Sequence, residues 1–333
     1  MKSPSLAVFL MLAAAAPALA QPVSTNVETV YSDAQRAADQ DLARRFVGSL
    51  LAPSASFENQ YAKWTRPVCV NVYGLSAMSK VMIERRIRDV AAQVGAPVDR
   101  ADGCIPNVTI AFSPEPQATL TSVAQAAPFL VTGGKKRQLT VTQPVQSWYT
   151  TFRRDFSGLA QLDLNWEDAA TAGGVEAAGS VGALTPATGD STIMSNMGES
   201  SAQANGNSGG IERDIPRVRS QGTRLSTGIT PEMGAVLVIV DTKAIMGMPL
   251  GSLADYLALT VLSQAPATGR CQEAPSIANL MANCPGDVKT TSLSNVDIAL
   301  LTGLYETPLK PEMIQRARII GAMRRTLEAQ TIR

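Results

Sequence analysis

The segment 169–210 most strongly constrains how this chain can fold, because it cannot contribute to a hydrophobic core. Most of its residues are Ala, Gly, Ser, Thr or Asn, and it contains no aromatic residue and no Lys or Arg. Such a composition buries too little apolar surface to offset the entropy that is lost on ordering. We therefore expect a disordered insertion or flexible linker over 169–222, with one core built jointly from the parts before and after it.

The part before this linker predicts a strand–helix–strand unit within 64–168, preceded by an N-terminal helical segment over 21–63. Residues 68–73 and 107–112 alternate between apolar and polar residues and read as strands. Between these two strands the apolar residues recur at helical spacing, which predicts a helix with Ile83, Ile87, Val90 and Val94 on one face. A right-handed crossover would make the two strands parallel. Other expected elements are helices at 33–51 and 117–130 and strands at 138–141 and 145–152.

The part after the linker, 223–333, predicts one buried strand and three helices. Residues 234–240 are almost continuously apolar, as in a strand that is buried on both faces. A helix is expected at 250–262, a second is capped by Ser294 and Asp297, and Pro311 opens a third. The two parts together indicate a single α+β domain.

The first 20 residues have the organisation of a bacterial signal peptide. A basic Lys2 precedes the apolar run 6–12, and residues 18–20 (Ala-Leu-Ala) form a cleavage pattern before Gln21. No later segment is long and apolar enough for a membrane span. The sequence predicts a mature protein that begins at Gln21 and is periplasmic or secreted.

The four cysteines are expected to form disulfides, because the count is even and the chain carries an export signal. Four cysteines allow three pairings, and proximity favours Cys69–Cys104 and Cys271–Cys284. The competing interpretation is a zinc site with four thiolate ligands. Neither pair has the C-x2-C spacing that such sites usually use.

The chain contains no histidine, which excludes Ser-His-Asp and Cys-His catalysis and every His-ligated metal site. A formal net charge of +1 gives no overall attraction to nucleic acid. Asp241-Thr242 after an apolar strand is similar to an aspartic-peptidase turn, but Lys243 stands where that turn needs Gly and no second copy exists. We expect Asp241 to cap a turn instead.

The C-terminal part resembles the catalytic half of metzincin-like zinc peptidases. In that family an H-E-x-x-H helix follows a buried strand, and a later helix opens with Leu-Ser or Leu-Thr, carries Asp three residues on and ends in Leu-Tyr. The matching residues here are the helix around 253–258, Ser276-Ile277 and the stretch 293–305, with its Leu293-Ser294, Asp297 and Leu304-Tyr305. Exported proteins of proteobacteria with the same helix and Leu-Tyr ending are also similar.

The resemblance implies a zincin-like scaffold that has lost its metal site. In the best register Ala254 and Ala258 replace the two zinc-binding histidines, Asp255 takes the place of the general-base Glu, and Gln264 that of the third ligand. We therefore expect no catalytic residue, no metal and no cofactor. Asp255 and Tyr256 are the candidates for contact with a ligand in the vestigial cleft.

The function expected from these observations is that of a non-catalytic binding or structural protein of the cell envelope. Its partner would be another protein or an envelope ligand, with no nucleic acid involved. The alternative is a hydrolase that uses Ser, Lys or carboxylate chemistry. A hydrolase should have a cleft with a strongly shifted Lys or carboxyl pKa, whereas a binding protein should expose an apolar patch.

Overall fold

The structure is a computed structural model that describes residues 24–51, 60–98, 104–131, 139–154, 160–162, 230–265, 269–308 and 312–331. The expected signal peptide at 1–20, its cleavage before Gln21 and the expected linker at 169–222 lie outside these residues. The described residues form a mixed α+β fold, as the sequence predicts.

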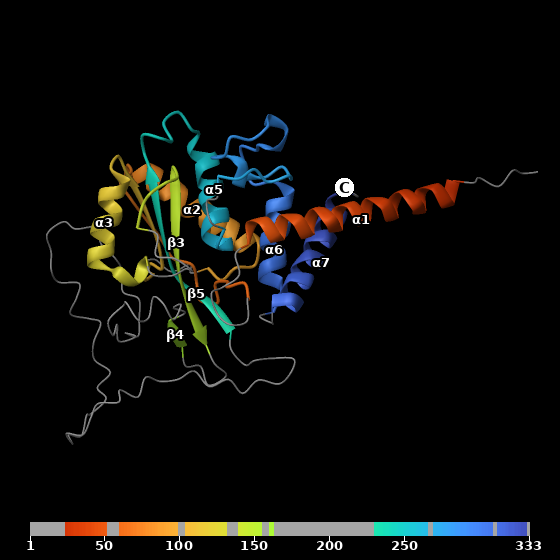
Figure 1. The fold of residues 1–333 in the computed structure, drawn as a ribbon, viewed down its shortest axis with the longest axis horizontal. Helices are drawn as coiled ribbons and strands as arrows, with labels where there is room; N and C mark the ends of the chain where they lie inside the picture. Colours follow the sequence, from red (N-terminus) through yellow and green to blue (C-terminus); the bar gives the residue numbers. More distant parts are fainter. Residues whose placement is uncertain are drawn as a thin grey trace, which may run out of the picture.

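The centre of the fold is a five-stranded sheet in the order β1-β2-β5-β3-β4 (Figure 1). The first three strands in this order are parallel to one another, which confirms the strand–helix–strand prediction. The other two continue the sheet in antiparallel fashion beyond β5. The strands are β1 (Val70–Tyr73), β2 (Val108–Ser113), β3 (Val145–Arg154), β4 (Ala160–Leu162) and β5 (Thr230–Asp241).

Helices cover both faces of the sheet, with α3 on one side and α2 and α5 on the other (Figure 1). Helices α6 and α7 lie on the side of α5 that faces away from the sheet. Helix α1 packs on α7, and the N-terminal half of α1 extends away from the body. The helices are α1 (Ser24–Leu50), α2 (Ala77–Gln93), α3 (Pro116–Ala126), α5 (Leu250–Ser263), α6 (Asn295–Glu306) and α7 (Glu312–Thr331), with short 3-10 turns at Pro128–Leu130, Ile277–Asn279 and Gly286–Val288.

Strand β5 is buried on both faces because its side chains belong to two hydrophobic clusters, one on each face. Val236, Val238 and Val240 join the main core with α2 and α5, whereas Leu237 and Ile239 face α3. This arrangement confirms the double-sided burial that the continuous apolar run predicts. It also fixes α5 above the centre of the sheet.

The prediction of a strand at 138–141 is wrong for residues 139–141, which are the ones that the structure describes. Residues 139–142 are irregular, and glutamine side chains take up their backbone groups. Gln117 donates to Leu139 O at 2.9 Å and accepts from Val141 N at 2.9 Å. Gln146 donates to Thr140 O at 3.0 Å and accepts from Thr142 N at 2.7 Å. The side-chain amides of Gln117 and Gln146 therefore replace the backbone hydrogen bonds to a neighbouring strand that a β-strand would need.

Two helix boundaries also differ from the expected ones. The helix expected at 33–51 begins earlier, since α1 spans Ser24–Leu50. The helix expected at 117–130 is divided, because Ala127 leaves helical geometry with φ −144° and ψ 68° before Pro128. Pro128 favours this break, since a proline disfavours helical geometry in the residue before it.

Candidate functional site

Helix α5 is buried from Ser252 onward, so the two positions that the resemblance aligns with zinc ligands, Ala254 and Ala258, lie inside the core. Ala254 and Ala258 have 0% exposed surface. Every residue from Ser252 to Ser263 is buried, because the helix is apolar around most of its circumference. The two alanines are packing residues within the hydrophobic cluster that also contains β5.

Aromatic side chains satisfy the carbonyl groups at the C-terminal end of α5. Trp64 Nε1 donates to Val261 O at 3.0 Å, Tyr305 OH to Leu262 O at 2.9 Å, and Tyr149 OH lies 2.9 Å from both Thr260 O and Ala265 O. The last carbonyls of a helix have no partner within the helix, and burial would make them costly. These contacts explain how the end of α5 can be buried.

Asp255 is also buried, and its carboxylate is committed to two contacts within the chain. One oxygen forms an ion pair with Arg86 of α2. The other accepts a hydrogen bond from Leu293 N at 3.0 Å, just before α6. Only 4% of Asp255 is exposed. The residue therefore ties α5 to α2 and to the start of α6.

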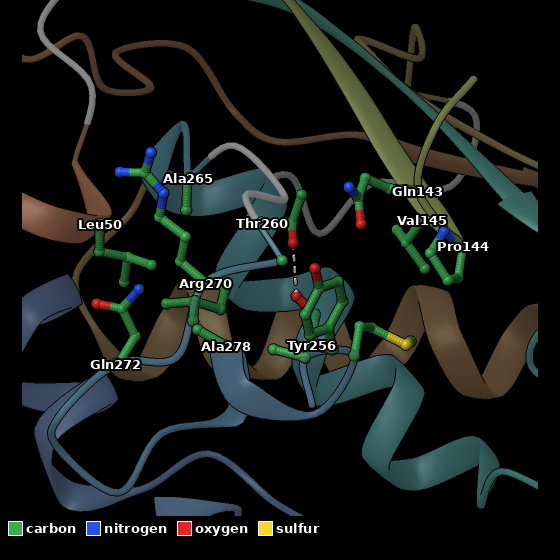
Figure 2. Close-up of a pocket in the computed structure, with 14 residues that line it drawn as sticks. Leu50, Gln143, Pro144, Val145, Tyr256, Thr260, Ala265, Arg270, Gln272 and Ala278 are labelled. Carbon is green, nitrogen blue, oxygen red and sulfur yellow. Dashed lines mark hydrogen bonds between the residues drawn. The ribbon is translucent and has the colours of Figure 1, made fainter. Parts of the chain in front are cut away.

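Tyr256 points in another direction and lines a pocket (Figure 2). Its side chain lies between Gln143 and Val145, at the start of β3, and the loop residue Arg270 (Figure 2). Further wall residues are Leu50, Leu259, Thr260, Gln272 and Met281. The structure thus separates Asp255 from Tyr256, and of these two neighbours Tyr256 alone lines this pocket.

The Tyr256 hydroxyl is a hydrogen-bond donor without a partner among the described residues. Burial raises the pKa of Tyr256 to about 12, so the phenol keeps its proton at neutral pH. Thr260 Oγ1 bonds instead to the backbone carbonyl of Tyr256 at 2.9 Å. The hydroxyl oxygen is not among the buried side-chain atoms that lack a partner in the described part of the chain, so it keeps contact with solvent.

Gln264, which the resemblance aligns with the third zinc ligand, follows the last residue of α5 in the left-handed conformation with φ 51°. Its Oε1 atom is buried and has no hydrogen-bond partner in the part of the chain that the structure describes. An amide oxygen and two alanines do not form a metal site. Likewise, the structure shows no group of three or more metal-ligating side chains among its described residues.

A second buried carboxylate, Asp297, opens α6. It accepts hydrogen bonds from Ser294 N at 2.8 Å, Ser294 Oγ at 2.9 Å, Ser276 Oγ at 2.5 Å and Ile277 N at 2.9 Å. The first contact and the hydrogen bond that Asp297 N donates to Ser294 Oγ at 3.1 Å form the expected capping box, which is therefore confirmed. Burial raises the pKa of Asp297, and these hydrogen bonds lower it in part.

Both disulfides favoured by sequence proximity are present. Cys69–Cys104 joins the approaches to β1 and β2, with 6.0 Å between the Cα atoms. Cys271–Cys284 closes a short loop beside the pocket of Tyr256, with 5.4 Å between the Cα atoms. Asp241 caps its turn, as expected, and accepts from Lys243 N at 2.8 Å.

A group of large apolar side chains is exposed at the edge of the sheet where the parallel strands end. Met78, Val81 and Met82 share one face of α2, and Met246 lies in the turn between β5 and α5. Met78 and Met246 are 81% and 80% exposed. The Met82 side chain lies 4.0 Å from the place that a Cβ atom on Gly251 would occupy, so this face of α2 reaches the start of α5.

Comparison with known proteins identifies no relative: no family model, no curated protein and no solved structure matches the chain. Among the described residues, no helix is both long enough and apolar enough to cross a membrane. The sequence analysis names Tyr256 as a candidate but does not name Gln143, Arg270 or Gln272, which line the same pocket. None of these three belongs to a recognisable motif, and only the fold brings them together.

Proposed function

We propose that this chain is an exported, non-catalytic binding protein of the cell envelope, built on a zincin-like scaffold. One observation carries the non-catalytic part of the proposal. The residue that matches the general base, Asp255, is held by Arg86 and by Leu293 N. A general base must reach a water molecule or a substrate proton. Asp255 instead serves the packing of three elements.

The lysine and the carboxyl group whose pKa values are shifted among the described residues also have structural explanations, which weighs against the hydrolase alternative. Burial lowers the pKa of Lys63, but its Nζ donates to Tyr305 O at 2.9 Å and Thr307 O at 2.6 Å. Lys63 thereby caps the C-terminal end of α6. Asp297 caps the N-terminal end of the same helix. Both groups stabilise α6, and neither lines the pocket of Tyr256.

The exposed apolar side chains at the edge of the sheet, Met78, Val81, Met82 and Met246, support the binding part of the proposal. Methionine side chains adapt their shape to different apolar surfaces, and exposed apolar groups mark interaction sites. Export is supported by the N-terminal sequence pattern and by the two disulfides, which persist in oxidising compartments.

Two measurements test the proposal. Intact mass of protein from the periplasmic fraction should show a chain that begins at Gln21 and has no free thiol. The purified protein should not hydrolyse casein or a mixed peptide library. Hydrolysis that disappears in an Asp255→Asn variant would refute the non-catalytic assignment, and a retained Met1 or four free thiols would refute export.

A further inference from the structure

We propose that an exposed apolar patch at the starts of α2 and α5 docks this protein on an anionic lipid surface. The patch consists of Met78, Val81 and Met82 of α2 and of Met246 in the turn before α5. Helices α2 and α5 contact each other on one face of the sheet (Figure 1). The inference rests on the proposed function and deepens it, because it names the partner of a binding protein of the cell envelope.

The shape of the patch favours a lipid interface. Met78 and Met246 are the most exposed large apolar side chains among the described residues. Helix α2 buries its opposite side, including Ile83 and Ile87, in the core, so the patch projects into solvent. The boundary between headgroups and acyl chains adapts to projecting apolar side chains, and methionine adapts to it in turn. A protein partner would need pockets that match these side chains.

Unpaired cations border the patch and favour an anionic partner. Arg85 and Arg88 continue the exposed face of α2, since they follow Val81 at helical spacing, and Lys243 lies in the same turn as Met246. None of these three side chains has an ion pair within the described part of the chain.

Few acidic groups oppose these cations. Asp89 is the exposed carboxylate on this face of α2, and Glu84 is paired with Lys80. The first turns of α2 and α5 contain no acidic residue. The formal net charge of the whole chain is only +1, so the attraction to anionic lipid is local to this face.

Vesicle flotation tests the inference on the purified mature protein. One set of vesicles is pure phosphatidylcholine, and in the other a third of the lipid is phosphatidylglycerol. The protein should float with the anionic vesicles and bind the neutral ones at least about ten-fold more weakly, because cations near an anionic surface each contribute several-fold in affinity. High salt should weaken the binding, since it screens exposed charges.

Two double variants assign the binding to the patch. Met78→Ser with Met246→Ser should weaken binding at least about ten-fold, because two apolar side chains no longer enter the interface. Arg85→Gln with Arg88→Gln should weaken binding to the anionic vesicles roughly ten-fold. All four side chains are exposed, so both variants should unfold at the wild-type temperature.

The matched controls lie at the opposite edge of the sheet, where β1 and β2 begin. Ile105 is 68% exposed just before β2, and Arg66 is exposed just before β1. Ile105→Ser and Arg66→Gln remove the same kinds of side chain outside the patch and should bind like wild type.

The inference is overturned if the protein does not float with the anionic vesicles, which would favour a protein partner. It is also overturned if both lipids bind equally, or if the patch variants fold and bind like wild type. A dimer that the methionine variant dissociates, without flotation, would assign the patch to a second copy of the chain. Peptidase activity or a retained Met1 would overturn the proposed function and leave the vesicle result unchanged, so the two failures are distinguishable.

Discussion

Helices α5 and α6 each bury one carboxylate in their N-terminal half, but they stabilise it by different means. Asp255 in α5 has a cation, Arg86, and one backbone N–H. Asp297 in α6 has four neutral donors. The two carboxylates bind the consecutive amides of Leu293 and Ser294, so together they fix the chain before α6. The difference teaches that the same backbone segment can be held by charge from one side and by neutral hydrogen bonds from the other.

Removing the Asp297 carboxylate should have the largest effect on stability. Asp297→Ala leaves two backbone N–H groups and two hydroxyls without their acceptor in a fully buried site. We expect a loss of about 3–5 kcal/mol in the free energy of unfolding, because unpaired buried donors are costly. Urea unfolding measures this loss. Asp297→Asn retains one carbonyl oxygen and should lose less. If both variants lose under ~1 kcal/mol, the four contacts do not stabilise α6.

Removing the Asp255 carboxylate should cost less, which is the main test of the comparison. Asp255→Ala leaves Leu293 N unpaired, but 40% of the Arg86 side chain is exposed, so its guanidinium can return to water. We expect a loss of about 1–3 kcal/mol. Arg86→Gln should lose at least as much, because it leaves the Asp255 carboxylate, whose side chain is only 5% exposed, without its cation. A loss for Asp255→Ala that exceeds the loss for Asp297→Ala would reverse the comparison.

The raised pKa of Asp297 predicts a pH dependence that the Asp297→Asn variant should lack. The folded protein binds this proton more tightly than the unfolded chain does. Its stability therefore falls as the pH rises above 3.8, the ordinary pKa of the carboxyl, up to the raised folded value. We expect the wild type to lose stability relative to Asp297→Asn across this window. Urea unfolding at a series of pH values measures the difference, and a constant difference would contradict the prediction.

The smallest effect is expected beside Asp255, at Tyr256. Tyr256→Phe removes a hydroxyl that has no partner among the described residues, so the free energy of unfolding should change by less than ~0.5 kcal/mol. Tyr305→Phe is the matched control, because the Tyr305 hydroxyl donates to Leu262 O at 2.9 Å. That variant should lose about 1 kcal/mol. Equal losses in thermal unfolding would show that Tyr256 has a structural partner.

The capping box of α6 shows how far the sequence could predict this site. Ser294 and Asp297 stand three residues apart, so their mutual hydrogen bonds follow from helix geometry alone. Ser276 and Ile277 complete the Asp297 site from about twenty residues away, and no local spacing indicates that contact. The same limit applies to Asp255, whose partner Arg86 is 169 residues away.

Residues 139–142 show the opposite case, in which a local pattern misled. Their apolar and β-branched composition indicates a strand, but Gln117 and Gln146 bind the backbone groups that a strand would use. Strand formation depends on a neighbouring strand that accepts the ladder. The sequence of the segment carries no information about that neighbour.

The sequence by itself determined the α+β class, the buried strand β5 and the apolar helix α5, and it favoured both disulfide pairings. These features follow from periodicity, composition and short loop lengths, which act within a few residues or within one closed loop. Only the tertiary structure decided that Asp255 is a link to Arg86 and Leu293, and that Tyr256 meets Gln143, Arg270 and Gln272 in one pocket. Side-chain contacts over long sequence separations depend on how whole elements pack, and that packing is fixed by the complete core.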